Sequence, residues 1–380
     1  MALKPCSTHP SVRRRVALPD ALTDSLALVV QGVRRCGKST LLRQLVAHYG
    51  LEPARCVFVN FEDPRLTQLL DWPILDALVS AFRSKHPAAA QERMTFFFDE
   101  IQNVRGWERW LRSQLDRPQG NRFVVTGSNA ALLSGELGAV LTGRHRTVEL
   151  YPFHLREHCD ARHRGDTRGF LHEGGFPEPL TLTDGDKLRR QNFDDIINRD
   201  LRERLGARSS HPIRQVAQMA YEAAGSELSL RRIAAAAGLA TDTAGSYLAA
   251  CEAAYLLFGV PFFAFSKRKR TAYNRKYYPI DTGLQHVLGT PGGQDAGKTL
   301  ECAVALELRR RYRDVCYWRG DGEVDFVVQD GGRVIPVQVS LDGPQARHER
   351  ALRSFYEQFP QAGEAVFVSF DGFADWARAI

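Results

Sequence analysis

The chain has 380 residues, of which 44% are hydrophobic and 25% are charged, and its formal net charge is +7. This length exceeds what one compact domain usually needs, the composition argues against a disordered chain, and the charge allows an anionic partner without requiring one. No run of about eighteen apolar residues occurs, and the basic segment 1–20 has no apolar core behind it, so we expect a soluble cytoplasmic protein with several domains.

Five short apolar segments alternate with amphipathic segments between residues 26 and 150. This alternation predicts an α/β domain with a parallel sheet and helices on its faces. The nearly continuous apolar character of the segments is typical of strands that are buried on both sides. The predicted strands are 26–31, 56–60, 95–98, 122–126 and 148–150.

A loop with the pattern Gly-x-x-x-x-Gly-Lys-Ser follows the first predicted strand and precedes a helical segment. Its glycines let backbone amides approach phosphate groups, and the positive end of the following helix faces them. We expect Lys38 to reach the β and γ phosphates of ATP and Ser39 to offer its hydroxyl to Mg²⁺. A chance Gly-rich turn is the alternative, which the flanking strand and helix disfavour. The expected ATP-binding residues are Gly32, Arg34, Arg35, Cys36, Gly37, Lys38, Ser39 and Thr40.

Two carboxylates, Asp99 and Glu100, end the predicted strand 95–98. Such a pair is often only a solvated turn. Behind a phosphate-binding loop, however, it fits a catalytic pair in which Asp99 holds Mg²⁺ and Glu100 activates the attacking water as general base. The two motifs together predict a Mg²⁺-dependent ATPase.

Polar residues also follow the next predicted strand, where Ser128 and Asn129 come after Thr126. In ATPases of this class, a polar residue on the strand between the loop strand and the acidic strand contacts the γ phosphate or the water. We expect Ser128 or Asn129 to be this sensor, with Thr126 behind them. The alternative is a turn with a helix cap, which Ser and Asn also favour.

A cation usually faces the charge that develops on the transferred phosphate. Arg144 and Arg146, which follow Gly143, and Arg199 beside Asp200 are the candidates. Surface ion pairs are the alternative role for each of them. Because such an arginine acts either within a subunit or across an interface, the sequence leaves the oligomeric state open.

Residues 151–225 are predicted to be mostly helical, and we interpret them as a lid or linker. Two helices at 229–237 and 241–253 follow, separated by Gly238, and then an apolar run. This is a helix-turn-helix spacing with a strand behind it, as in a winged helix. The second helix has no Arg or Lys, which argues against its reading a DNA groove.

A run of four basic residues lies on a predicted loop after this region. Such a run is usually solvated surface. Because aromatic residues follow it at Tyr273, Tyr277 and Tyr278, DNA or RNA remains a candidate partner. The basic residues are Lys267, Arg268, Lys269 and Arg270.

These motifs, in this order, resemble the bacterial and archaeal AAA-type ATPases that carry a C-terminal domain of unknown function. The resemblance covers about residues 26–345 and implies an AAA-class sheet, a winged-helix-like middle and a largely unassigned physiological role. It also predicts a core strand, turn and helix at 276–284. The matching segments are 32–42, 98–102 with Trp107, 126–128, 141–144, 150–153, 174–177 and 199–200.

The resemblance further implies a C-terminal domain similar to PD-(D/E)xK nucleases, in which a helix Glu, a strand Asp and a Glu-x-Lys gather a metal. Here Glu301 lies on a predicted helix and Asp325 on a predicted strand, but Gln338 and Ser340 replace the Glu and the Lys. Both replacements remove charge that metal binding and catalysis use. We therefore interpret the domain as a degenerate scaffold, built as a small α/β domain with antiparallel strands.

The sequence thus predicts an ATP-binding protein and Mg²⁺-dependent ATPase that acts as a motor or switch on nucleic acid. An ATP-gated protein-assembly module is the alternative, and an ATP-regulated nuclease is the weaker one. The expected parts are an N-terminal extension (1–25), an AAA-type core (26–150), a helical lid or linker (151–225), a winged-helix-like domain (226–288) and the nuclease-like domain (289–380).

Overall fold

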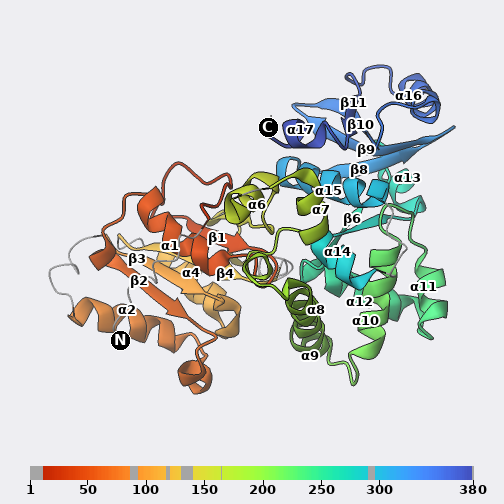
Figure 1. Ribbon diagram of the computed structural model, residues 1–380. Coiled ribbons are helices and arrows are strands. Elements are labelled where there is room, and N and C mark those ends of the chain that lie inside the picture. Colours follow the sequence, from red (N-terminus) through yellow and green to blue (C-terminus); the bar gives the residue numbers. More distant parts are fainter. Residues whose placement is uncertain are drawn as a thin grey trace. The chain divides into compact units, whose positions relative to one another are not determined.

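Figure 1 shows a computed structural model of the chain, which describes residues 12–85, 93–116, 120–129, 140–163, 165–289 and 296–378. The chain divides into two compact units, Met1–Leu150 and Tyr151–Ile380, named here the N-terminal unit and the C-terminal unit. Among the described helices, none is both long and apolar enough to cross a membrane.

The N-terminal unit is built on a sheet of five parallel strands in the order β2-β3-β4-β1-β5. All five predicted strands are present, but the last is shifted: it was expected at 148–150 and begins at His145. This edge strand pairs only with β1, so its polar first residues need no apolar cover. The strands are β1 (Ala27–Gln31), β2 (Cys56–Asn60), β3 (Thr95–Asp99), β4 (Arg122–Gly127) and β5 (His145–Glu149).

Aromatic side chains fill the core of the N-terminal unit between the sheet and a helix. Phe96 stacks on Phe123, and Trp110 lies edge-on to the same ring at 5.5 Å between centroids. Burying each such side chain is worth about 1.5–3 kcal/mol, so this packing holds β3 and β4 in register. The helical segments are α1 (Lys38–His48), α2 (Pro73–Lys85), α4 (Trp107–Asp116), η1 (Pro53–Arg55), η2 (Pro64–Leu69) and η3 (Ile101–Asn103).

The C-terminal unit begins with the predicted helical region. Its Gly174–Gly175 loop is buried: the amide of Gly175 donates to Asp281, and a Cβ on Gly175 would lie 2.1 Å from the carbonyl oxygen of Phe153. Only glycine fits this approach. The helices are α6 (Leu155–Arg162), α7 (Thr167–Glu173), η5 (Glu178–Thr181), α8 (Gly185–Asp195), the π-helical η6 (Ile196–Leu201), α9 (Arg202–Leu205) and α10 (His211–Glu222).

Two helices separated by Gly238 follow, and the chain then forms an antiparallel pair of strands. The basic run expected on a loop is instead a short helix, α13, because Lys, Arg and Ala favour helices and no Gly or Pro interrupts them. The strand, turn and helix predicted at 276–284 are present. The elements are α11 (Leu230–Ala236), α12 (Thr241–Ala253), β6 (Leu257–Val260), α13 (Lys267–Ala272), β7 (Lys276–Pro279) and α14 (Thr282–Leu288).

The chain ends in a four-stranded sheet of order β11-β10-β9-β8, with α15 on one side and α16 on the other (Figure 1). The prediction of antiparallel strands is wrong for one pair, since β10 and β11 run parallel. The crossover helix α16 carries the chain back, which parallel pairing requires. The elements are α15 (Ala296–Arg311), β8 (Val315–Arg319), β9 (Glu323–Asp330), β10 (Arg333–Ser340), α16 (Ala346–Gln358), β11 (Val366–Ser369) and α17 (Phe373–Arg378).

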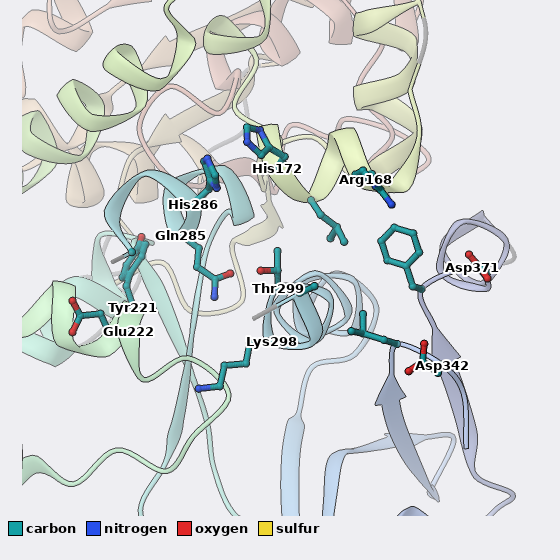
Figure 2. Close-up of a pocket in the computed structure, with 15 residues that line it drawn as sticks. Arg168, His172, Tyr221, Glu222, Gln285, His286, Lys298, Thr299, Asp342 and Asp371 are labelled. Atoms are coloured by element: carbon teal, nitrogen blue, oxygen red, sulfur yellow. The ribbon is translucent and has the colours of Figure 1, made fainter. Parts of the chain in front are cut away.

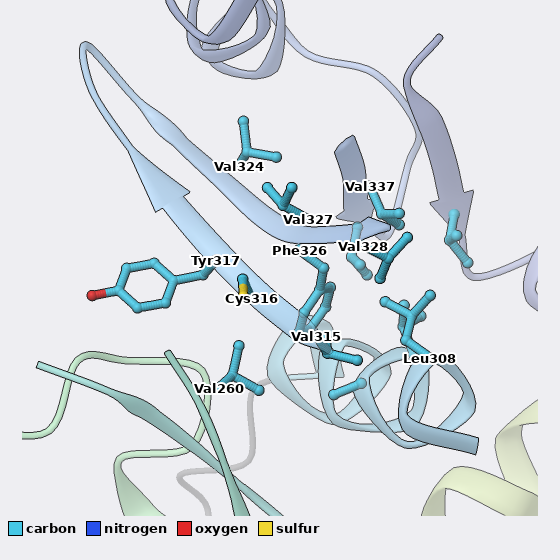
Figure 3. Close-up of a cluster of buried hydrophobic side chains, with 14 of the residues drawn as sticks. Val260, Leu308, Val315, Cys316, Tyr317, Val324, Phe326, Val327, Val328 and Val337 are labelled. Atoms are coloured by element: carbon cyan, nitrogen blue, oxygen red, sulfur yellow. The ribbon is translucent and has the colours of Figure 1, made fainter. Parts of the chain in front are cut away.

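Figure 3 shows the apolar cluster that holds this sheet to its neighbours. Leu308 of α15 faces the valines of β8 and β9, and Val260 of β6 lies near Tyr317. These side chains are buried and continuous with one another. The strand pair β6-β7 and the final sheet therefore share one core.

Candidate active site

The loop between β1 and α1 has the backbone that a phosphate cradle needs. A Cβ on Gly32 would lie 2.0 Å from the carbonyl oxygen of Leu150, and Gly37 has a φ of 100°. Both positions therefore demand glycine. Arg35 is also left-handed, with a φ of 66°. The loop leads directly into the N-terminus of α1, where free amide groups and the helix dipole favour a phosphate group.

Lys38, the first residue of α1, folds back over this loop. Its ammonium donates to the carbonyl oxygens of Gly32 at 3.1 Å and Val33 at 3.2 Å, and it lies 3.4 Å from a carboxylate oxygen of Glu100. The Lys38 side chain is buried, so its charge has these partners in place of bulk water. The ammonium therefore bridges the loop and the acidic pair.

Asp99 at the end of β3 is held from two sides. The hydroxyl of Ser39 donates to one carboxylate oxygen at 2.5 Å, and the hydroxyl of Thr126 donates to the other. Burial raises the pKa of Asp99, while the two hydroxyls act against this rise. Hydroxyl and carboxylate oxygens are the ligands that Mg²⁺ prefers, so the pair Ser39 and Asp99 fits this ion.

Glu100 lies in a left-handed backbone conformation with a φ of 54°, which is uncommon for a residue other than glycine. Its amide donates to the Thr126 hydroxyl at 2.9 Å, and one carboxylate oxygen accepts from the side chain of Gln102 at 2.6 Å. Burial acts to raise the pKa of Glu100, but polar neighbours outweigh burial and lower it. These neighbours are Lys38, Gln102, Arg34 and Ser128.

The residues predicted as a sensor follow β4, which lies between β1 and β3 as expected. Ser128 is buried beside Glu100 and helps to lower the pKa of that carboxyl, and Asn129 is half-buried. Thr126, which the sequence placed only behind them, makes the direct contacts with Asp99 and Glu100. The contact depends on the pairing of β4 with β3, which the sequence did not reveal.

Two of the three candidate arginines lie away from the loop. Arg144 precedes β5 and Arg146 is its second residue, and this end of β5 pairs with Ala27 at the start of β1. The loop follows the opposite end of β1, and Arg144 pairs with Asp116 at 2.9 Å. The structure therefore does not bring Arg144 or Arg146 to Lys38 within the N-terminal unit. Arg199 belongs to η6 of the C-terminal unit.

Sequence reasoning missed two contacts of the loop. The guanidinium of Arg14, which is buried, donates to the carbonyl oxygen of Cys36 at 2.5 Å. Arg34 forms an ion pair with Glu62 at 2.8 Å, just beyond β2. Local sequence carries no signal for either contact, because both partners lie more than twenty residues away.

The nuclease-like residues gather at one end of the final sheet. The carboxylate of Asp325 accepts the amide of Val339 at 2.7 Å, and Gln338 donates to the carbonyl oxygen of Glu323 at 3.0 Å. Ser340 is buried at the end of β10. Burial raises the pKa of Asp325, and Glu301, which faces the same region from α15, adds to the rise.

Lys267, Arg268 and Lys269 of the basic run are exposed and Arg270 is half-buried, but two of the three aromatic residues expected beside the run are buried. Tyr277 and Tyr278 are buried in β7, so they cannot stack on bases, which corrects that part of the prediction. Tyr273 is exposed, and its ring stacks on Phe262 at 3.9 Å between centroids. Phe265, which the sequence analysis did not single out, is 69% exposed next to the run.

A cavity of about 610 Å³ lies within the C-terminal unit. Figure 2 shows His172 and His286 facing each other across its upper wall, and their ring centroids are 3.9 Å apart. Arg168 and Lys298 also line the cavity, as do three carboxylates, Glu222, Asp342 and Asp371. Charges of both signs alternate around it and favour no single ligand class.

Comparison with known families finds three successive matches along the chain. Residues 24–159 match an AAA domain, residues 164–294 match a domain of unknown function (DUF8612), and residues 296–373 match another domain of unknown function (DUF4143). With its five-stranded parallel sheet and phosphate-binding loop, the chain has an AAA-type ATPase domain. The two later families are described only as domains of unknown function, so they support neither the nuclease-like nor the winged-helix-like prediction.

Relatives span nearly the whole chain. An uncharacterized protein of Methanocaldococcus jannaschii is 28% identical over 86% of this chain and 77% of its own length. The crystal structure of Cdc6p from Pyrobaculum aerophilum covers 62% of this chain and 82% of its own at 12% identity, but its TM-score of 0.29 is too low to support an argument. An uncharacterized protein of Haemophilus influenzae is 30% identical over 84% of both chains, and this chain therefore belongs to the same family as that protein.

Proposed function

We propose that this protein hydrolyses ATP to ADP and phosphate with Mg²⁺ at the site between the loop and the acidic pair. The observation that carries the proposal is the convergence of four side chains from separate motifs. Ser39 reaches Asp99 at 2.5 Å, and Lys38 reaches Glu100 at 3.4 Å. This is the set that ATP binding, metal binding and water activation need.

The contacts of Lys38 support a switch between two sets of partners. Its present partners are two loop carbonyls and Glu100. On ATP binding, Lys38 would turn to the β and γ phosphates, which compete better for an ammonium than carbonyl oxygens do. Glu100 would then lose its cationic partner and be available as base. Mg²⁺ held by Ser39 and Asp99 would neutralise phosphate charge.

The remaining roles follow from position. Ser128, beside Glu100, or Asn129 would sense the γ phosphate. Arg199 is the favoured cation for the transferred phosphate, because it lies in a π-helical segment, and such segments are frequent at functional sites. Arg144 and Arg146 would serve only across a subunit interface, since they lie at the opposite end of β1.

The finer proposal is that ATP turnover drives a motor or switch on nucleic acid. It rests on one surface, named here the basic-aromatic patch: Phe265, Lys267, Arg268, Lys269 and Tyr273, all exposed. Cations grip phosphates and exposed rings stack on bases, a combination typical of single-strand binding. Helix α12 contributes no Arg or Lys, so groove reading is not part of the proposal.

The alternative is that ATP binding gates assembly with a protein partner. The absence of cations from α12, whose residues Thr241, Asp242 and Ser246 are exposed, favours this alternative for the helix pair itself. Salt dependence separates the two functions, because phosphate contacts release counterions and protein contacts usually do so much less.

The activity is tested with the purified full chain. ATP hydrolysis should require Mg²⁺ and stop in EDTA, and Lys38→Ala should lose ATP binding. Lys85→Ala, which removes an exposed lysine at the end of α2, is the matched control and should retain both. Undiminished ATP binding by Lys38→Ala would contradict the site.

The nucleic-acid proposal is tested by fluorescence anisotropy with labelled single-stranded DNA and RNA at low salt, with and without ATP. Lys267→Glu/Arg268→Glu should weaken binding and lower the salt slope by about one for each lost phosphate contact. Arg350→Glu/Arg353→Glu makes the same charge change on exposed residues of α16 and should not. If the protein does not bind single-stranded DNA or RNA at low salt, or if both variants bind with equal affinity, the nucleic-acid proposal fails and ATP-gated protein assembly is the function that remains.

We also propose that the final domain is a nuclease-like scaffold without activity, since Gln338 and Ser340 cannot supply the charges of Glu and Lys. Mg²⁺ or Mn²⁺ should then elicit no DNA cleavage. Metal-dependent nicking that is lost in Asp325→Ala would contradict this interpretation.

A further inference from the structure

A buried lysine lies among three carboxylates at one end of the final sheet. Lys276 is the first residue of β7, and its side chain is fully buried. Its ammonium donates to Glu323 and lies 3.7 Å from a carboxylate oxygen of Glu301. Asp325 is the third carboxylate that acts on this ammonium. An ammonium removed from water needs such partners to remain charged.

The carboxylates come from two other elements and are themselves held in place. Glu301 of α15 accepts from the Tyr278 hydroxyl at 2.6 Å, and Asp325 of β9 accepts the amide of Val339 at 2.7 Å. The ammonium also lies 5.3 Å from the centre of the Tyr317 ring, a cation–π distance. Lys276 therefore joins β7, α15 and the final sheet at one point.

The charges of the cluster depend on one another. Burial lowers the pKa of Lys276, but the carboxylates outweigh burial and raise it. Burial raises the pKa of Asp325 to about 8, with Glu301 adding to the rise and Lys276 opposing it. Without the ammonium, this region would hold three carboxyl groups and would lose the buried positive charge that lies among them.

We propose that this cluster is a cation site and that the chain's own Lys276 fills it, where a divalent ion would otherwise lie between the carboxylates. With Lys276 in place, no group of three acidic, His or Cys side chains within the described residues is arranged to hold a metal, so the carboxylates must draw together before they could bind an ion. The side chain of Lys276 is closed to solvent, so it serves neither as a nucleophile nor as a phosphate ligand.

This inference goes beyond ATP hydrolysis and is independent of it. It gives a reason to expect no metal at the residues predicted to be nuclease-like, in addition to the missing charges at Gln338 and Ser340. It also identifies a link between the strand pair β6-β7 and the final domain that a metal chelator cannot release.

The test is Mn²⁺ binding to the full-length Lys276→Met variant, followed by electron paramagnetic resonance. The variant should bind one Mn²⁺ more than the wild type, with a dissociation constant of roughly 10⁻³ M or tighter. Lys276→Met/Asp325→Asn should lose the added site, and Lys187→Met, which removes an exposed lysine of α8, should not gain it. A folded Lys276→Met with no added site would overturn the proposal.

A second measurement covers the case in which Lys276→Met is unfolded. Removing one charge of each sign, in Lys276→Met/Glu323→Gln, should return the thermal midpoint toward that of the wild type, because fewer uncompensated carboxylates remain. If adding Glu323→Gln to Lys276→Met does not raise the thermal midpoint, the ammonium does not balance these carboxylates and the proposal fails.

Discussion

Replacing Thr126 with valine tests whether its hydroxyl organises the acidic pair. Valine has nearly the same shape and is also β-branched, so the strand itself is retained. The hydroxyl of Thr126 is fully buried, donates to Asp99 and accepts from the amide of Glu100. The change to valine removes both hydrogen bonds.

The size of the effect follows from these two bonds. A buried amide left without a partner costs about 1–3 kcal/mol, and a bond to a charged group contributes about 1.5–3 kcal/mol. Because the added methyl group offsets part of this loss, we expect the N-terminal unit to lose about 2–4 kcal/mol of unfolding free energy. The pKa of Asp99 should also rise, since the Thr126 hydroxyl acts to lower it.

Hydrogen exchange measured by mass spectrometry on the full chain reports the two units separately. Amides of β3 and β4 that exchange through opening of the whole unit should exchange about 30- to 700-fold faster in Thr126→Val. Thr147→Val makes the same chemical change at an exposed position of β5 and should alter these rates little. Equal protection of β3 and β4 in the two variants would refute the reasoning.

Two further predictions concern single carboxyl groups. Gln102→Ala removes a hydrogen bond that lowers the pKa of Glu100, so the acid limb of the pH profile of kcat/KM should move to higher pH. The control Gln68→Ala, at an exposed position, should leave this limb unchanged. If the limb does not move in Gln102→Ala, either Glu100 is not the base or the hydrogen bond does not affect its pKa. Asp325 has a folded pKa of about 8 against an ordinary value of 3.8, so its contribution to stability is full below about pH 4 and is lost as the pH rises through about 8. Urea unfolding of the C-terminal unit at several pH values should show this decline in the wild type and a smaller one in Asp325→Asn; equal slopes would contradict the assignment.

The parts of the fold that sequence predicted are those with a local signal. The strands β1 and β3 are buried on both faces, Gly32 marks a position where a side chain cannot fit, and Gly37 marks one with a positive φ. The exception, β5, is an edge strand with polar residues at its start, so its apolar signal is short.

The parts that were not predicted depend on which elements become neighbours. Thr126 reaches Asp99 only because β4 lies beside β3, and Lys276 reaches Glu323 only because β7 packs against the final sheet. The parallel pairing of β10 with β11 likewise follows from the crossover helix between them. Composition and spacing carry no information about such contacts across 27 or 47 residues.

The central claim is that Glu100 activates water for ATP hydrolysis, and single-turnover hydrolysis by Glu100→Gln tests it most directly. The amide keeps the shape of the side chain, but it replaces one acceptor oxygen by an NH₂ donor and cannot accept a proton. The variant should bind ATP and Mg²⁺ with an affinity close to that of the wild type and release phosphate at least about 100-fold more slowly. Phosphate release at the wild-type rate would contradict the proposed mechanism.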